Sequence, residues 1–148
     1  MMARRIVLSA ALAAALAAAG CSMMDSSMNR PTMAGNTMAV ALSPGNEVPP
    51  NSSGGSGSAK VSLDANVLTW TITYSGLTGP VTAGHFHGPA QPGVNAGVVV
   101  PFTGSLASPI TGTATLTAEQ VGQVKAGLWY INLHTATAPG GEIRGQVK

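Results

Sequence analysis

The sequence predicts an all-β fold: a Greek-key β-sandwich of seven to eight short strands with one short helix. Short runs with a period of two, rich in β-branched residues, recur along the chain. Turn signals of Gly, Pro, Asn and Ser separate these runs, and only one stretch has helical spacing. The 148 residues suffice for one such domain with appendages. We place the domain at residues 38–148.

The first 20 residues have the pattern of an export signal. Arg4 and Arg5 form a short basic start, and an apolar run over residues 6–19 follows. This run is shorter than the ~20 residues that a membrane-spanning helix needs, and it ends in small residues. We therefore assign residues 1–20 to a signal peptide and leave them out of the fold.

Cys21, the only cysteine of the chain, directly follows the small residues Ala18, Ala19 and Gly20. This pattern resembles the cleavage box of bacterial lipoproteins, in which the cysteine becomes the lipidated N-terminus. Because an exported protein has little use for one unpaired thiol, we expect Cys21 to anchor the protein to a membrane. Ser22 in the next position resembles the sorting signal for the outer membrane, so we expect its periplasmic face. An ordinary secretory signal with an incidental thiol is the alternative.

Removal of the signal leaves five basic and five acidic side chains, and hence no net charge. With no basic patch, a nucleic-acid partner is not expected, and a protein partner cannot be read from the sequence.

Residues 21–37 lack periodicity and are rich in Ser, Asn, Pro and Gly, which predicts a flexible tether between lipid and domain. All methionines of the mature chain lie in this stretch or at its edge: Met23, Met24, Met28, Met33 and Met38. Thioethers are soft ligands that suit Cu(I), so these side chains are candidate copper ligands. Compositional drift in an unconstrained segment is the alternative.

The strand patterns begin at residue 38. We expect strands over residues 38–42, 59–64, 67–74, 97–102, 110–116, 128–135 and 142–147, and one more around His85 that begins near residue 83. The second and third alternate clearly and are joined by a turn at residues 64–66, which predicts a hairpin. Pro101 places its strand near a sheet edge or a bulge. The one helix should cover residues 117–127, because Thr117 fits an N-cap with Gln120 three residues later and Gly127 fits its end.

Several motifs of this pattern resemble the CHRD domain family, named after chordin. They are Glu47-Val48-Pro49-Pro50, the stretch Thr82 to Ala90 with its His-x-His, the stretch Gly127 to Thr135, and the closing Pro139 to Gln146. The match spans about residues 38–148 in the right order. The resemblance implies a β-sandwich in an exported protein and brings little assigned biochemistry.

The three histidines of the chain all fall in strands. His85 and His87 lie two residues apart and therefore share one face, while Phe86 takes the other. In the later strand Trp129, Ile131 and Leu133 form the apolar face and leave His134 with Tyr130 and Asn132. If the two strands are neighbours, the imidazoles converge and suit copper first, or zinc. Alternatively, each histidine bonds to a loop carbonyl and binds no metal.

Asn132, Glu142 and Arg144 are candidates for the rim of this site, although Glu142 and Arg144 share parity and could instead form an ion pair. The histidines are similar in arrangement to the copper half of the copper–zinc superoxide dismutases, and Arg144 is similar to their substrate-guiding arginine. Since no other histidine exists, a second metal site of that kind is excluded. Nucleophile elbows, phosphate loops and paired carboxylates are missing from the sequence.

Three hypotheses about function follow. The first is a lipid-anchored envelope protein that binds one copper ion through His85, His87 and His134. The second is a metal-free module whose loops bind another envelope component. The third is a redox enzyme with dismutase-like activity.

Overall fold

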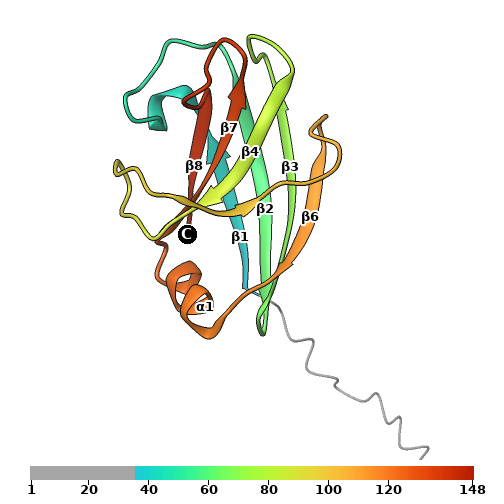
Figure 1. The fold of residues 1–148 in the computed structure, drawn as a ribbon, viewed down its shortest axis with the longest axis vertical. Helices are drawn as coiled ribbons and strands as arrows, with labels where there is room; N and C mark the ends of the chain where they lie inside the picture. Colours follow the sequence, from blue (N-terminus) through green and yellow to red (C-terminus); the bar gives the residue numbers. More distant parts are fainter. Residues whose placement is uncertain (1–35) are drawn as a thin grey trace, which may run out of the picture. The chain divides into compact units, whose positions relative to one another are not determined.

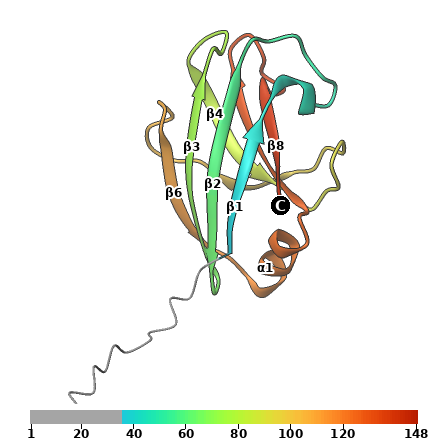
Figure 2. The same ribbon diagram turned by 180° about the vertical axis from the view of Figure 1, so that it is seen from behind.

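The computed structural model describes residues 36–148, which form a sandwich of two four-stranded antiparallel sheets (Figures 1 and 2). The first sheet has the order β1 (Asn36–Leu42), β2 (Ser56–Asp64), β3 (Val67–Ser75) and β6 (Ile110–Thr115). The second has the order β5 (Val98–Pro101), β4 (Val81–His87), β7 (Trp129–Thr135) and β8 (Ile143–Val147). Two short helices complete it, namely the 3-10 helix η1 (Pro44–Asn46) and the α-helix α1 (Ala118–Lys125).

The connections confirm the Greek-key prediction. After β3 the chain crosses to the second sheet for the β4–β5 hairpin, and then returns to place β6 beside β3. Strand β5 lies at a sheet edge, as Pro101 predicts. Strand β2 begins at Ser56, earlier than predicted, because its backbone pairing continues as far as Ser75 of β3. Strand β1 likewise begins at Asn36, two residues before the expected boundary.

The core lies between the sheets, where the alternating apolar side chains of both meet. Trp70 of β3 has ring-centroid distances of 5.1 Å to Phe86 and 5.3 Å to Phe102. Gly112 faces Trp70 so closely that a Cβ would lie 2.2 Å from the indole, which explains the glycine at this strand position. Such close packing stabilises the fold without any disulfide.

Helix α1 covers one end of the sandwich (Figure 1). Thr117 accepts a hydrogen bond from the Gln120 backbone, and the Gln120 side chain accepts one from the Thr117 backbone, which confirms the predicted capping box. Val124 is buried against the core. Within residues 36–148 no helix is both long enough and apolar enough to cross a membrane.

The end of β1 is joined to β8, and this joint carries the following loop onto the second sheet. The Ser43 N–H donates to the Arg144 carbonyl at 3.0 Å, and the Arg144 N–H donates to the Ser43 carbonyl at 3.1 Å. Figure 2 shows the segment with η1 beside β8. Residues 44–51 and the β4–β5 loop therefore cover part of the outer face of this sheet.

Candidate metal centre

Strand pairing brings the three histidines together on the outer face of the second sheet. His85 lies opposite Asn132, His87 opposite Tyr130, and His134 opposite Ala83 of the neighbouring strand. Phe86 lies between the two histidines of β4, and Ile131 lies between Tyr130 and Asn132 of β7. Both are fully buried in the core. The expectation from strand parity is confirmed, because β4 and β7 are direct neighbours.

The imidazoles are close enough to serve one ion. Their ligand atoms all lie within 4.8 Å of one another, and His85 Nδ1 is 3.2 Å from His134 Nε2. Imidazole–metal bonds of about 2.0 Å put two ligand atoms at most ~4 Å apart, so the set has to close by about an ångström around an ion. All three side chains are half-buried, which leaves the centre reachable from solvent.

Backbone carbonyls hold the far nitrogen of two of the rings. His87 Nδ1 lies 3.0 Å from the Ala96 carbonyl, and His134 Nδ1 lies 2.9 Å from the Pro139 carbonyl. Because a carbonyl only accepts, Nδ1 carries the proton in each neutral ring and Nε2 keeps its lone pair. Metal-binding histidines have this arrangement, in which the outer hydrogen bond orients the ring and fixes its tautomer.

His87 Nε2 is the clearest sign of a ligand. It is buried and has no hydrogen-bond partner among the described residues. The alternative expectation, histidines satisfied by loop carbonyls, thus accounts for Nδ1 of His87 and leaves Nε2 unexplained. A buried acceptor without a partner is costly, and an ion bound there removes that cost.

The electrostatics keep the rings neutral. Burial lowers the pKa of His85, His87 and His134 below the usual value of 6.5. Mutual repulsion with neighbouring histidines lowers the pKa of His85 and of His87 further. A neutral imidazole has the lone pair that a metal requires, so the cluster needs no deprotonation to bind one at neutral pH.

Tyr130 supports His87 from one side. The two rings are stacked with centroids 4.8 Å apart and planes inclined by 2°. The Tyr130 hydroxyl donates to the Ala96 carbonyl and accepts from the Ala96 N–H at 3.1 Å, so the same residue holds both rings. Tyr130 was predicted on this face of its strand, but not as part of the site. Its parity with Asn132 and His134 was the available signal.

Arg144 packs on the Tyr130 ring, with its Cζ 3.4 Å from the ring centroid. Its guanidinium donates to Asn95 Oδ1 at 2.9 Å and to the Val94 carbonyl at 2.6 Å, and the residue is 2 % exposed. Arg144 therefore lies against Tyr130, which is itself stacked on His87. Its guanidinium is buried and bound, however, and does not resemble a surface arginine that guides an anion.

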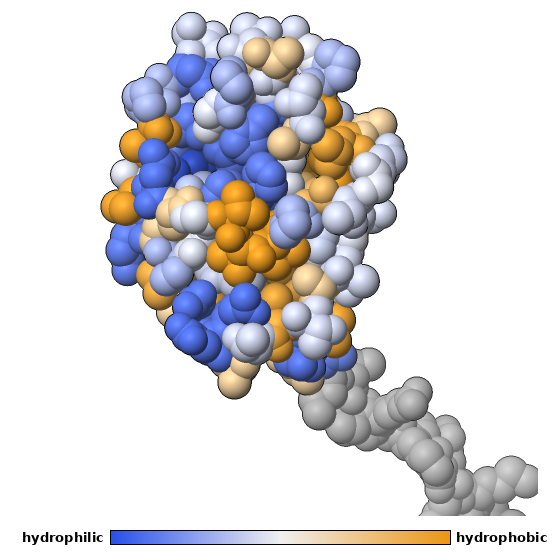
Figure 3. Space-filling model, viewed as in Figure 1, coloured by the Kyte–Doolittle hydropathy of each residue, from blue (hydrophilic) through white to orange (hydrophobic). Residues whose placement is uncertain are grey.

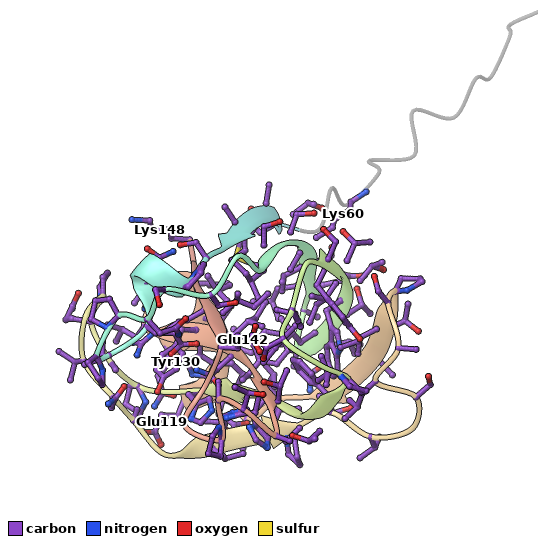
Figure 4. All side chains as sticks on the ribbon, turned by 90° about the horizontal axis from the view of Figure 1, so that it is seen from above. Lys60, Glu119, Tyr130, Glu142 and Lys148 are labelled. Atoms are coloured by element: carbon purple, nitrogen blue, oxygen red, sulfur yellow. The ribbon has the colours of Figure 1, made fainter. Side chains whose placement is uncertain are left out.

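Glu142 has a different role from the one expected. Its carboxylate accepts hydrogen bonds from Ser53 Oγ, from Thr135 Oγ1, and from both the backbone N–H and the hydroxyl of Thr78. It does not pair with Arg144, whose partners lie in the β4–β5 loop. Glu142 precedes β8, so strand alternation does not extend to it. Figure 4 places its label toward the middle of the molecule, away from the margins where Lys60 and Lys148 lie.

Asn132 lies in the same row as His85 and Arg144 and is buried. Its Nδ2 donates to both carboxylate oxygens of Glu47 at 2.9 Å. Burial raises the pKa of Glu47 to about 7, although the charge of Arg144 and the hydrogen bond from Asn132 act in the opposite direction. Sequence reasoning missed Glu47 as part of the site, and its place in the Glu-Val-Pro-Pro motif was the only signal.

The surface around the cluster is polar. Figure 3 shows hydrophilic residues gathered over β4 and β7, beside an apolar area. Cys21 and four of the candidate methionine ligands (Met23, Met24, Met28 and Met33) lie outside the described residues, as do the signal peptide and most of the tether. Met38 is described: it pairs with Val61 in the first sheet and packs against the core.

Comparison with protein families found one match. The family model described as CHRD domain matches residues 38–147. Searches of curated proteins and of solved structures found no match.

Proposed function

The chain belongs to the CHRD domain family, and on that premise we propose that it is a lipid-anchored envelope protein that binds one copper ion through His85, His87 and His134. The observation that carries the proposal is the buried, unpartnered Nε2 of His87, within 4.8 Å of the ligand atoms of two more imidazoles. Copper is favoured over zinc by the order of affinities for nitrogen donors and by the thioethers of the tether. Structural zinc sites usually have four protein ligands, and copper binds such donors most tightly among divalent first-row ions.

The tether and the anchor support the same proposal. Four methionines of the tether, Met23, Met24, Met28 and Met33, supply thioethers that suit Cu(I) and would deliver the ion to the imidazoles or buffer it. Cys21 as a lipidated N-terminus holds both parts at the periplasmic face of the outer membrane.

Titration of the purified mature chain with Cu(II), Cu(I) and Zn(II), each against a competing chelator, tests the copper site. We expect one ion per chain in the wild type and a loss of affinity of at least tenfold in His85→Ala and in His134→Ala. Lys60→Ala, at an exposed position on the other sheet, is the matched control and should bind as the wild type does. Equal binding by all four proteins, or binding by none, rejects the site and favours the metal-free interaction module.

The dismutase-like hypothesis loses one of its supports. The guanidinium of Arg144 is held by Asn95 and Val94, and its Cζ lies 3.4 Å from the centroid of the Tyr130 ring, so it does not extend into solvent to attract superoxide. We therefore propose binding, and not redox catalysis, as the function of the copper site.

A further inference from the structure

We propose that Arg144 makes the histidine cluster prefer Cu(I) over Cu(II). The inference rests on the copper site proposed above and specifies which form of the ion that site takes. Three neutral imidazoles add no charge of their own, so the charged side chains around them decide how well a dication is tolerated.

The geometry couples Arg144 to one of the ligands. The guanidinium carbon lies 3.4 Å from the centroid of Tyr130, and the Tyr130 ring is stacked on His87 at 4.8 Å. Arg144 is 2 % exposed, so water screens its charge only weakly. The guanidinium therefore lies one aromatic ring away from His87.

The field of Arg144 is felt at the ligand. One aromatic ring and little water separate the Arg144 guanidinium from His87, so its charge acts on an ion held there. A charge that disfavours a proton on the His87 ring also disfavours a cation at its Nε2.

This repulsion grows with the charge of the ion. In a simple Coulomb description Cu(II) is disfavoured twice as strongly as Cu(I), while the bonds to the three nitrogens remain available to both. The difference shifts the preference toward the monovalent ion. Cu(I) is also the form that the tether methionines suit, so one oxidation state would be held at both places.

Substitutions that change the charge with little change of shape provide the test. Asn95 accepts a hydrogen bond from Arg144 Nη1 at 2.9 Å and is exposed, so Asn95→Asp places a carboxylate on the guanidinium while Arg144 stays in place. Asn95→Ala removes the same contact without adding charge. Arg144→Gln removes the charge, and Arg144→Lys keeps it. Because Glu47 also interacts with Arg144, all titrations are made at one pH.

The readout is the ratio of the Cu(I) and Cu(II) affinities of the mature chain, measured anaerobically with a chromophoric chelator for each ion. We expect the ratio to fall about tenfold in Arg144→Gln and about threefold in Asn95→Asp, because one nearby positive charge is lost or neutralised. Arg144→Lys and Asn95→Ala should keep the wild-type ratio. Loss of structure changes both affinities together, and therefore does not imitate a change in the ratio.

An unchanged ratio of affinities in Asn95→Asp overturns the inference. If the ratio falls in Asn95→Ala as much as in Asn95→Asp, the effect comes from the loop geometry and the inference is overturned as well. If Arg144→Gln does not fold, the comparison of the two Asn95 variants decides. A wild type that binds neither ion rejects the copper site itself. If the wild type binds both ions and the ratio of affinities does not change with the charge at these positions, the copper site stands and only the inference about Arg144 fails.

Discussion

Asn132 Nδ2 lies 2.9 Å from both carboxylate oxygens of Glu47, which joins a strand of the second sheet to the loop that covers it. Glu47 is 5 % exposed, and its burial raises its pKa to about 7. The carboxyl group therefore holds its proton in the folded chain at pH values where the unfolded chain has lost it. The stability of the contact between Asn132 and Glu47 therefore depends on pH.

Glu47→Gln should remove a pH dependence of folding. Between about pH 4.5 and 7 the folded state binds one more proton than the unfolded state, so this group makes the free energy of unfolding fall as pH rises. The total loss is up to about 3 kcal/mol across that window. Urea unfolding at pH 5 and pH 8 measures it. The decrease should be smaller in Glu47→Gln and unchanged in the exposed control Glu119→Gln; equal slopes in all three proteins would contradict the assignment.

Strand alternation predicted the part of the site that lies within strands. His85, His87 and His134 share a face because the period of two holds throughout β4 and β7, and the pairing of these strands then brings the rings together. The same rule failed for Glu142, which lies outside β8. Gly141, with φ of +128°, precedes it, and strand parity does not extend across such a residue.

Loops supply the part that the sequence could not predict. Alternation suggests an outer face open to water, yet Asn132 and Arg144 are buried because residues 44–51 and the β4–β5 loop cover them. Neither loop has a periodic pattern that would indicate where it folds. The contacts of Glu47 follow from the backbone pairing of Ser43 with Arg144. The Ala96 carbonyl that orients His87 lies in the β4–β5 loop, which the Arg144 side chain holds through Asn95 and Val94.

Glu142→Gln should destabilise the fold by about 2–4 kcal/mol at pH 7. The groups around Glu142 all donate hydrogen bonds to its carboxylate, and the NH₂ group of a glutamine would place another donor against them. Burial favours the neutral acid, but the hydrogen bonds from Ser53, Thr135 and Thr78 outweigh it and leave the pKa of Glu142 below its usual value. The stabilisation is therefore present above the unfolded pKa of 4.5 and is lost as pH falls through the lower folded value.

Chemical denaturation of Glu142→Gln at pH 7 and at pH 3 checks this sign. The deficit relative to wild type should be large at pH 7 and smaller at pH 3. A deficit of the same size at both values would show that shape, and not ionisation, is what the site requires.

Cys21→Ser should release the protein from the membrane. The prediction rests on the lipoprotein-like box before Cys21, and a lipidated N-terminus adds apolar chains that hold a protein at a bilayer. Fractionation of cells that produce the full chain, with labelled palmitate, measures both effects. Wild type should be labelled and sediment with membranes, whereas Cys21→Ser should be unlabelled and remain in the soluble fraction. Ser22→Ala, next to it, is the matched control; labelled membrane protein in Cys21→Ser would refute the anchor.

Gly141→Ala should disrupt the Glu47–Asn132 contact, whereas Gly140→Ala should not. Gly141 has φ of +128°, and a Cβ there would lie 2.8 Å from both Glu47 oxygens and 2.4 Å from Asn132 Nδ2. Strain and displacement together should cost more than about 2 kcal/mol of stability. A Cβ on Gly140 meets nothing within 4 Å, so that variant differs little from wild type.

The two glycine variants also report on the histidines. His134 Nδ1 is held by the Pro139 carbonyl in the same turn, so a shift of this turn should weaken copper binding as well as folding. Thermal unfolding and copper titration of both variants measure the two effects. If Gly141→Ala is as stable as Gly140→Ala, the close approach of Glu47, Asn132 and the turn is not as tight as the structure has it, and the carboxyl group is then free to take up water and lose its raised pKa.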